Sequence, residues 1–149
     1  AIVLSFIWTD IISDTENLRK QLYADEISVI MDQRFLDVML FVMQIVKRIR
    51  KYYGGLTTAT QQISDYLKSS VREQGEAIIA NSAYQFYFNI GLDGVQYFKG
   101  TNLLPESEME FIQYAGIGQC YAKIGSSTAM RMAVEIDPNV FEIIEQMKG

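Results

Sequence analysis

The chain contains no histidine and one cysteine, Cys120, among its 149 residues. The absence of histidine excludes Ser-His and Cys-His nucleophilic sites, histidine-based zinc sites and imidazole acid–base chemistry. A single cysteine cannot form an internal disulfide or a thiolate cluster, which is typical of a protein in the reducing cytoplasm. Because no neighbouring residue would activate the thiol, we expect Cys120 to be an ordinary small apolar residue in a strand.

Proline is scarce, and long apolar runs are missing. The chain has 2 Pro, 9 Tyr, 8 Phe and 1 Trp and is 49% hydrophobic, which favours one well-packed domain over a disordered segment. Its longest largely apolar runs, 1–8 and 38–46, are too short to span a bilayer. The net charge of -5 gives no overall attraction to nucleic acid, so a contact with DNA would require a local patch. Since no initiator methionine is present, we expect the chain to be part of a longer protein.

A phosphate-binding loop is also missing. No G-x-x-x-x-G-K-[ST] motif occurs, so these residues alone are expected to bind ATP weakly or not at all and to be inactive as an enzyme. The run 21–26, however, reads as a short buried strand that ends in two adjacent carboxylates, Asp25 and Glu26. RecA-type nucleotide motors build one end of their ATP site in this way: the first carboxylate holds magnesium through water, and the second orients or deprotonates the attacking water. A surface turn with two acidic residues is the alternative interpretation.

The hydrophobic pattern predicts helices that alternate with strands. A largely apolar helix at about 34–52, which would have to be covered on two sides, ends at Gly54-Gly55. Ser70 and Glu73 form a capping box that would open another helix. Helices are further expected at about 2–18, 70–79, 92–99, 105–114 and after Asp137-Pro138, and strands at 22–25, 56–60, 84–89, 117–124 and 128–136.

This alternation predicts a single α/β domain over residues 1–149, with a mostly parallel sheet flanked by helices, a C-terminal β-hairpin and a terminal helix. The aromatic strand at 84–89 is expected to be central in the sheet. In parallel sheets the ligand crevice lies beyond the carboxyl ends of the strands. Asp25-Glu26, Thr60-Gln61 and Asn89 fall at such ends, and this convergence favours a functional site over simple packing.

Several segments together resemble a known family. The basic cluster that begins at Lys47 and runs to Gly54-Gly55, followed by Thr60-Gln61 and Asp65, is similar to a block found in TraC-type conjugative transfer ATPases. These proteins are the large cytoplasmic motors of type IV secretion systems. The resemblance runs from about Leu22 to Gly149. It includes the Ala80-Asn81-Ser82 segment before an aromatic strand and the Gly116-x-Gly118 turn ahead of the terminal hairpin.

Carried over residue by residue, the resemblance implies a RecA-like P-loop NTPase fold, of which this chain is the C-terminal portion without the Walker A half. Asp25 would be the magnesium-side carboxylate of the Walker B strand, and Glu26 would activate water. Gln61 would be a polar sensor that touches water or the γ-phosphate. Arg48 or Arg50 would lie at a subunit boundary and offer its guanidinium to a nucleotide bound next door.

The resemblance also implies cofactors and partners. They are ATP and Mg²⁺ in the full-length protein, and no metal cluster is expected. The protein would form a homo-oligomer, expected as a hexameric ring, and would contact other secretion-system subunits at the membrane, with DNA as an indirect partner. It would lie in the cytoplasm, associated with the inner face of the cell membrane through the secretion complex.

The residues themselves leave plainer interpretations open. Arg48 and Arg50 could be the cationic end of a helix, which the helix macrodipole favours. Gln61 could be a polar strand end without a role. Asn81 could contact a nucleotide or serve as a helix C-cap. Asn89-Ile90 also departs from the family, which has Asn-Gln there, so that one expected polar contact becomes aliphatic.

Three functions therefore remain under consideration. The leading hypothesis is part of an ATP-hydrolysing motor that powers conjugative transfer of DNA or protein through a type IV secretion system. The second is a non-catalytic assembly or docking module of the secretion complex, which the Asn89-Ile90 departure and the apolar surface of the long helix favour. The third is a related DNA translocase of the FtsK or HerA type, which the local motifs do not exclude.

Overall fold

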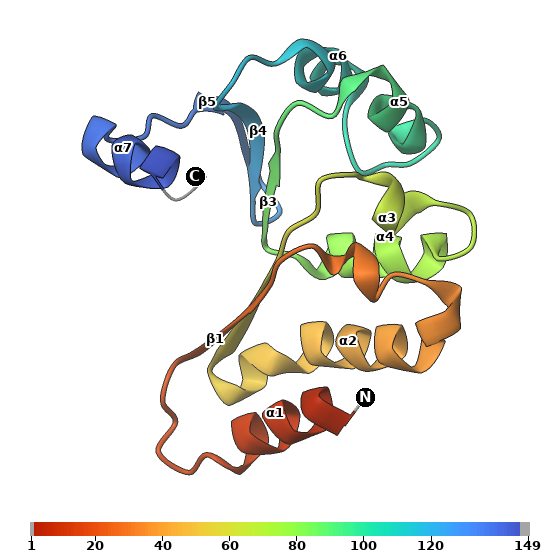
Figure 1. Ribbon diagram of the computed structural model, residues 1–149. Helices are drawn as coiled ribbons and strands as arrows, with labels where there is room; N and C mark the ends of the chain where they lie inside the picture. Colours follow the sequence, from red (N-terminus) through yellow and green to blue (C-terminus); the bar gives the residue numbers. More distant parts are fainter. Residues whose placement is uncertain (1, 147–149) are drawn as a thin grey trace.

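Figure 1 shows the computed structural model, which describes residues 2–146. Helices and strands alternate along the chain, and a hairpin and a helix close it, so the predicted α/β class is confirmed. The helices are α1 (Ile2–Ser13), α2 (Leu36–Arg48), α3 (Ser64–Leu67), α4 (Arg72–Asn81), α5 (Gly91–Val95), α6 (Glu106–Tyr114) and α7 (Pro138–Gln146). Short 3-10 segments are η1 (Ile27–Val29), η2 (Gln33–Phe35), η3 (Ile49–Tyr52) and η4 (Gln96–Phe98). The strands are β1 (Lys20–Ala24), β2 (Gly54–Thr58), β3 (Tyr84–Tyr87), β4 (Gln119–Ile124) and β5 (Thr128–Ala133).

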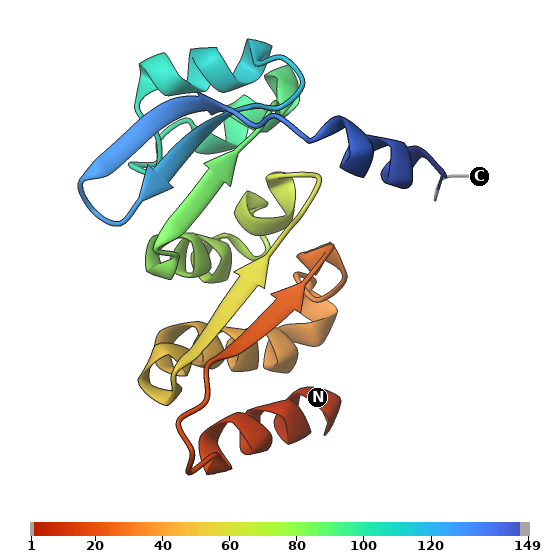
Figure 2. The ribbon, with the colours of Figure 1, turned by 90° about the vertical axis from the view of Figure 1, so that its left-hand side faces the viewer.

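The strands form two sheets. β1 and β2 pair in parallel, with Lys20 opposite Gly54 and Ala24 opposite Thr58. β3, β4 and β5 form an antiparallel sheet in that order, and β4 and β5 are the predicted hairpin. Figure 2 shows that β1, β2 and β3 point in the same general direction. β3, which was expected to be central, pairs with β4 alone in the described part of the chain.

α2 is the crossover that connects β1 to β2. Its buried Met39 and Val42 belong to the main core, whereas its Ile45 packs with Ile11 of α1 and Ile49 of η3. Leu36 and Leu40 at the start of α2 are exposed, so part of this apolar helix is uncovered. Within residues 2–146, no helix combines the length and the hydropathy that crossing a membrane would require.

α1 ends at Ser13, earlier than the pattern predicts. The Asp14 carboxylate accepts hydrogen bonds from the backbone N–H groups of Glu16 (2.9 Å) and Leu18 (3.0 Å) and from the ammonium group of Lys20. An Asp side chain that captures the amides after it offers the backbone a turn in place of another helical turn. The predicted extension to residue 18 is therefore wrong.

Two further predictions differ from the structure. β1 was expected to be buried, but its Tyr23 is 77% exposed, because the parallel sheet has only two strands in the described part of the chain. α4 begins after Val71 without a side-chain cap, so the capping box predicted at Ser70 is not formed. Asp137, in contrast, caps α7 as expected by accepting a hydrogen bond from the Asn139 N–H (2.8 Å).

The chain exposes more surface than a typical folded protein of its size. Its accessible surface is 10345 Å², whereas a monomer of 17.0 kDa is expected to expose about 7,700 Å². Part of the excess comes from α7, which extends away from the other elements in Figures 1 and 2. Exposed apolar side chains contribute as well, including Phe6, Tyr84, Phe86, Leu92 and Ile117. Such a surface is typical of a unit that is covered by further protein.

The main core depends on a close approach of α3 and α4. Phe98, Met31 and Leu67 are fully buried in this core. Gly75 of α4 is buried against α3, and a Cβ added there would overlap with the carbonyl oxygen of Tyr66. Any side chain at this position would therefore push the two helices apart.

Gly75→Ala should destabilise the protein by about 1–3 kcal/mol, the usual cost of overpacking, although alanine is the better helix former. The free energy of unfolding from urea denaturation measures the effect. Ala80→Gly, at an exposed position of the same helix, is the matched control and should cost about 0.5–1 kcal/mol through helix propensity alone. A stabilising Gly75→Ala would show that the two helices do not meet at this point.

Arg131 of β5 connects the hairpin to α6. Its guanidinium donates hydrogen bonds to both carboxylate oxygens of Glu108 (2.9 and 3.2 Å) and to the carbonyl oxygen of Ser107 (3.3 Å). It also lies 4.6 Å from the ring centroid of Phe111. The hydrogen bonds from Arg131 hold the pKa of Glu108 below its ordinary value of 4.5.

This ion pair predicts a pH-dependent contribution to stability. Because the pKa of Glu108 is lower in the folded state, the pair stabilises the fold fully above about pH 4.5, and that contribution is lost as the pH falls through the folded-state pKa. The urea midpoints of the wild type and Arg131→Met should therefore differ at neutral pH and approach each other near pH 3. Glu108→Gln should show the same narrowing. A difference that does not change with pH would assign the effect of Arg131 to its contact with Phe111.

Candidate functional site at the carboxyl ends of β1 and β2

The parallel ladder continues beyond the two strands and joins the segments that follow them. The Ala59 N–H donates to the carbonyl oxygen of Ala24 (3.0 Å), and the Ile27 N–H donates to the carbonyl oxygen of Ala59 (3.0 Å). The two residues between these bonds on the β1 side are Asp25 and Glu26. The backbone therefore holds the two carboxylates beside the start of the 59–61 segment, as the parallel arrangement predicts.

Asp25 and Glu26 differ in their surroundings. Asp25 is exposed, and its Oδ1 accepts a hydrogen bond from the N–H of Glu26 (3.0 Å). Glu26 is half-buried and adopts a left-handed conformation (φ 51°, ψ 60°). Its Oε1 accepts a hydrogen bond from the Ser28 hydroxyl (2.7 Å). Both carboxylates are thus oriented by hydrogen bonds from the turn in which they lie.

Thr60 organises the segment after β2. Its hydroxyl donates a hydrogen bond to the Asp65 carboxylate and also accepts one from the Gln62 N–H (3.3 Å). Tyr66, from the same segment, donates to the Thr58 hydroxyl (2.8 Å), and burial raises its pKa to about 12. The Gln61 side chain is exposed, and within residues 2–146 it forms no hydrogen bond with Asp25 or Glu26. The backbone bonds to the turn after β1 are made by Ala59, two residues before Gln61.

Arg48 and Arg50 lie at the opposite end of the strands. They end α2 and begin η3, which leads into Gly54 at the start of β2, opposite Lys20 at the start of β1. A five-residue strand, at about 3.3 Å per residue, separates them from Asp25 by roughly 15 Å. Neither arginine can therefore reach the carboxylates of its own chain. Both lie in the last turns of α2 and η3, where the interpretation as the cationic end of a helix places them.

The two asparagines singled out from the sequence bind local backbone groups. Asn81 is exposed and donates to the Ala77 carbonyl (2.7 Å) as the last residue of α4, whereas the C-cap position that was considered for it is taken by Ser82. Asn89 donates to the Ala115 carbonyl (2.7 Å) and accepts from the Gly91 N–H (2.9 Å). It connects the end of β3 to the end of α6. Ile90, which departs from the family, packs against the main core.

The carboxyl ends of β1 and β2 present few ligands for a metal ion. Within the described residues, no group of three or more Asp, Glu, Cys or His side chains could hold a metal. Magnesium at nucleotide sites is usually held by one or two carboxylates together with phosphate oxygens and water. Asp25 fits that requirement, because it is exposed and only one of its two carboxylate oxygens accepts a hydrogen bond within the turn.

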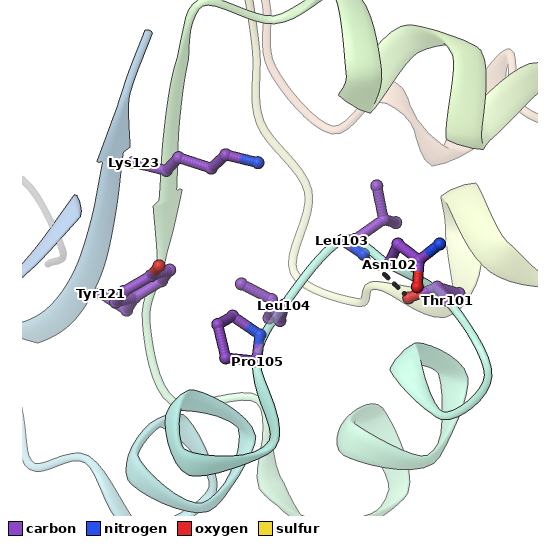
Figure 3. Close-up of a pocket in the computed structure, with 7 residues that line it drawn as sticks. All are labelled: Thr101, Asn102, Leu103, Leu104, Pro105, Tyr121 and Lys123. Carbon is purple, nitrogen blue, oxygen red and sulfur yellow. Dashed lines mark hydrogen bonds between the residues drawn. The ribbon is translucent and has the colours of Figure 1, made fainter. Parts of the chain in front are cut away.

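Two recesses of about 370 Å³ each lie elsewhere. Figure 3 shows the first, in which Tyr121 and Lys123 of β4 face the loop that carries Leu104 and Pro105. Burial raises the pKa of Tyr121 there. None of the residues predicted from the sequence as site residues lines this recess.

The second recess is at the starts of β1 and β2. Its lining includes Arg19, Arg50, Tyr53 and Gly54-Gly55. No sequence motif predicted a functional role for Arg19 or Tyr53. The adjacency of Arg19-Lys20 to the Arg50–Gly55 segment depends on strand pairing, and no spacing within the sequence indicates it.

Comparisons with known proteins include a match to a solved structure. No protein-family model matches the chain, and no curated protein sequence matches it. Its structure is similar to that of VirB4 of Thermoanaerobacter pseudethanolicus, with a TM-score of 0.79 and 25% sequence identity. The match covers 93% of this chain and 37% of the VirB4 chain, so these residues span a little over a third of that protein's length.

The match tests the fold and the resemblance stated from the sequence. It covers nearly the whole chain, within a protein that is much longer. The resemblance to type IV secretion ATPases is thereby confirmed, and the chain has the fold of a partial ATPase domain of the VirB4 and TraC type.

Proposed function

We propose that this chain is the C-terminal part of a RecA-like motor domain that hydrolyses ATP to drive conjugative transfer of DNA or protein through a type IV secretion system. The observation that carries the proposal is the set of backbone hydrogen bonds that hold Asp25 and Glu26 beside the segment of Thr60 and Gln61. These residues follow two paired parallel strands, at the edge where α/β sheets bind ligands.

In this proposal the two carboxylates have different tasks. Bound Mg²⁺ would neutralise phosphate charge and polarise the transferred phosphoryl group. Asp25 would hold the metal through water, with its orientation fixed by the Glu26 N–H. Glu26 would orient or deprotonate the attacking water, with its carboxylate fixed by the Ser28 hydroxyl.

The backbone of Glu26 supports a functional role. Its φ of 51° lies in the left-handed region, which costs a residue with a Cβ atom about 1–2 kcal/mol. Glycine would adopt this conformation without that cost. A carboxylate placed at a strained turn, beside a second carboxylate, is a common property of functional sites.

The remaining residues would act on the nucleotide from two directions. Gln61, exposed beside Asp25 and Glu26, would contact water or the γ-phosphate. Arg48 or Arg50 would be supplied to a nucleotide bound by a neighbouring copy in a ring, since both lie too far from the carboxylates of their own chain. For Asn81, a nucleotide contact would require release of the Ala77 carbonyl, so we assign it to the helix end.

The divided sheet supports the expectation that the phosphate loop lies in a part of the protein outside these residues. β2 pairs only with β1, and β3 pairs only with β4, within the described residues. Each strand thus has an edge of unpaired backbone groups, which proteins normally pair or cover. A strand added at the unpaired edge of β1 would extend the sheet beside Asp25 and could place a phosphate loop there.

Glu26→Gln in the full-length protein tests the assigned base. The amide keeps the size of the side chain but cannot accept a proton, so turnover should fall by about 10²–10⁴-fold while the Kd for Mg-ATP stays within a few-fold of the wild type. Steady-state phosphate release and calorimetry measure the two quantities.

Glu73→Gln, at an exposed glutamate of α4, is the matched control and should leave both quantities unchanged. Normal turnover of Glu26→Gln would remove Glu26 from the mechanism. Loss of nucleotide binding together with turnover would instead assign Glu26 to the fold of the site.

A non-catalytic docking module is the second candidate, and the large exposed surface favours it. The accessible area of 10345 Å² and exposed apolar residues such as Phe86 and Ile117 would suit a scaffold in the secretion complex. Ile90, which is aliphatic where the family is polar, removes one contact that a motor would use. In either case the partners would be further copies of the protein and secretion subunits at the inner face of the membrane.

Nucleotide-dependent assembly separates the two candidates. A motor whose arginine reaches the neighbouring nucleotide should form larger oligomers with Mg²⁺ and a non-hydrolysable ATP analogue than without them. A scaffold should show the same size distribution in both conditions. Sedimentation velocity on the full-length protein measures this, and turnover stimulated by DNA would favour a translocase of the FtsK or HerA type.

A further inference from the structure

The recess at the starts of β1 and β2 combines unpaired arginines with an exposed aromatic ring. It has a volume of about 370 Å³ and is lined by Arg19, Arg50, Tyr53 and the Gly54-Gly55 pair. Lys20 and Gln21 complete the lining. It is a broad, open depression and not an enclosed cavity, so a ligand would lie across it.

Positive charge is concentrated at this end of the molecule. The chain has 13 Lys and Arg residues and a net charge of -5. Six of the 13 lie in two short segments that strand pairing brings together, 19–20 and 47–51. They are Arg19, Lys20, Lys47, Arg48, Arg50 and Lys51. A local patch of this kind is what an acidic chain requires for a contact with a polyanion.

Most of these cations lack an acidic partner. Lys20 forms an ion pair with Asp14. The ion pairs within the described residues use Lys20, Arg34, Arg72 and Arg131, so Arg19 and Arg50 remain unpaired. Unpaired guanidiniums on the wall of a recess suit phosphate, because their planar donors can bind two oxygens at once.

The side chains of Gln21 and Ile49 pack closely against the two glycines. A Cβ at Gly55 would overlap with the side-chain oxygen of Gln21, and one at Gly54 would lie 2.5 Å from Cγ1 of Ile49. The Gln21 amide is itself fixed by a hydrogen bond to the Thr57 hydroxyl (2.8 Å). The Gln21 side chain therefore covers Gly55 and forms part of the surface that a ligand would contact.

Tyr53 supplies an apolar face beside the arginines. It is 57% exposed and takes a left-handed conformation with φ 56°. This conformation is the C-terminal cap of η3, which would favour glycine or asparagine on backbone grounds. An exposed ring between cations is the arrangement with which proteins stack the bases of single-stranded nucleic acid.

Shape and extent distinguish among anionic partners. The recess is broad and open, and the exposed Tyr53 ring offers a stacking face that a nucleic-acid base can use and a lipid headgroup cannot. Lys47, Arg48 and Lys51 lie in the same α2–η3 segment as Arg50, so a polymer has more cations within reach than a free nucleotide has. An acidic peptide would pair with the guanidiniums but would offer no base to the Tyr53 ring.

We propose that the recess formed by Arg19, Arg50 and Tyr53 binds single-stranded nucleic acid. The arginines contact consecutive phosphates, and one base stacks on the Tyr53 ring. This site lies at the end of β1 and β2 opposite Asp25 and Glu26, so it does not depend on the proposed hydrolysis. Glu26→Gln should therefore bind nucleic acid as the wild type does.

Fluorescence anisotropy of a 5′-labelled 20-nucleotide oligothymidylate tests the proposal on the full-length protein. Affinity should fall as salt is raised from 50 to 200 mM, with a slope of about −0.7 in log–log form for each phosphate contact. Arg19→Glu should weaken binding at least tenfold and reduce that slope by about one contact, or roughly 0.7. Arg19 is chosen because Arg50 is also a candidate for the neighbouring nucleotide.

Tyr53→Asn separates stacking from charge. Asparagine tolerates the left-handed backbone but has no ring, so affinity should fall by at least about fivefold, as for the loss of one base stack, with an unchanged salt slope. Tyr53→Phe should bind as the wild type does. Lys99→Glu, an exposed charge reversal in the segment after η4, is the matched control for Arg19→Glu and should have no effect. Circular dichroism melting curves confirm that each variant is folded.

Several outcomes would overturn the proposal. Equal affinities of Arg19→Glu and Lys99→Glu would show that the recess does not contact the strand. Unchanged binding by Tyr53→Asn would mean that the patch attracts anions without reading a base. Displacement of the oligonucleotide by polyglutamate at equal charge concentration would assign the patch to an acidic protein. Arg19-dependent binding to phosphatidylserine vesicles in place of the oligonucleotide would assign it to a membrane surface.

Discussion

The candidate site depends on one constraint, the parallel register of β1 and β2. That register is continued past the strands by the bonds from Ala59 N–H to Ala24 and from Ile27 N–H to Ala59. Because these are backbone bonds, they fix where the turn after β1 lies whatever its side chains are. Asp25 can therefore be exposed, and Glu26 can be strained, while both keep their position. The fold determines where the two residues lie, and their carboxylates determine the chemistry.

The same register explains why the chain has two chemically different ends. A five-residue strand keeps the carboxylates at one end and the arginine-rich segments at the other. Opposite charges at this distance do not neutralise each other, since roughly 15 Å exceeds the Debye length of about 8 Å at physiological salt. Each end can therefore hold its own ligand.

The sequence predicted most of the helices and strands, because the patterns that indicate them are local. Helical periodicity lies within each helix, and Gly54-Gly55 and Asp137-Pro138 mark where a helix ends or begins. It predicted that the ends of β1 and β2 meet, because parallel pairing follows from alternation of strands and helices. It also placed Asn89 with them, whereas β3 pairs with β4 in the antiparallel sheet and Asn89 binds the Ala115 carbonyl. It did not predict the end of α1, where Asp14 captures amides up to Leu18, or the exposure of Tyr23, which depends on how many strands flank β1. Arg19 and Tyr53 were missed for the same reason: their proximity depends on strand pairing and not on their spacing in the chain.

The exposure of β1 also bears on how the site would be completed. A Walker B strand was expected to be buried, yet Tyr23 beside Asp25 is largely open to solvent, and β2 and β3 each have an unpaired edge in the described residues. Burial of a carboxylate strengthens its interactions, because the local dielectric constant falls. Protein that covers these edges would therefore do more than complete the sheet. It would remove water from around Asp25 and Glu26, so that binding of nucleotide, coverage of the sheet edge and activation of water would be coupled in a single step.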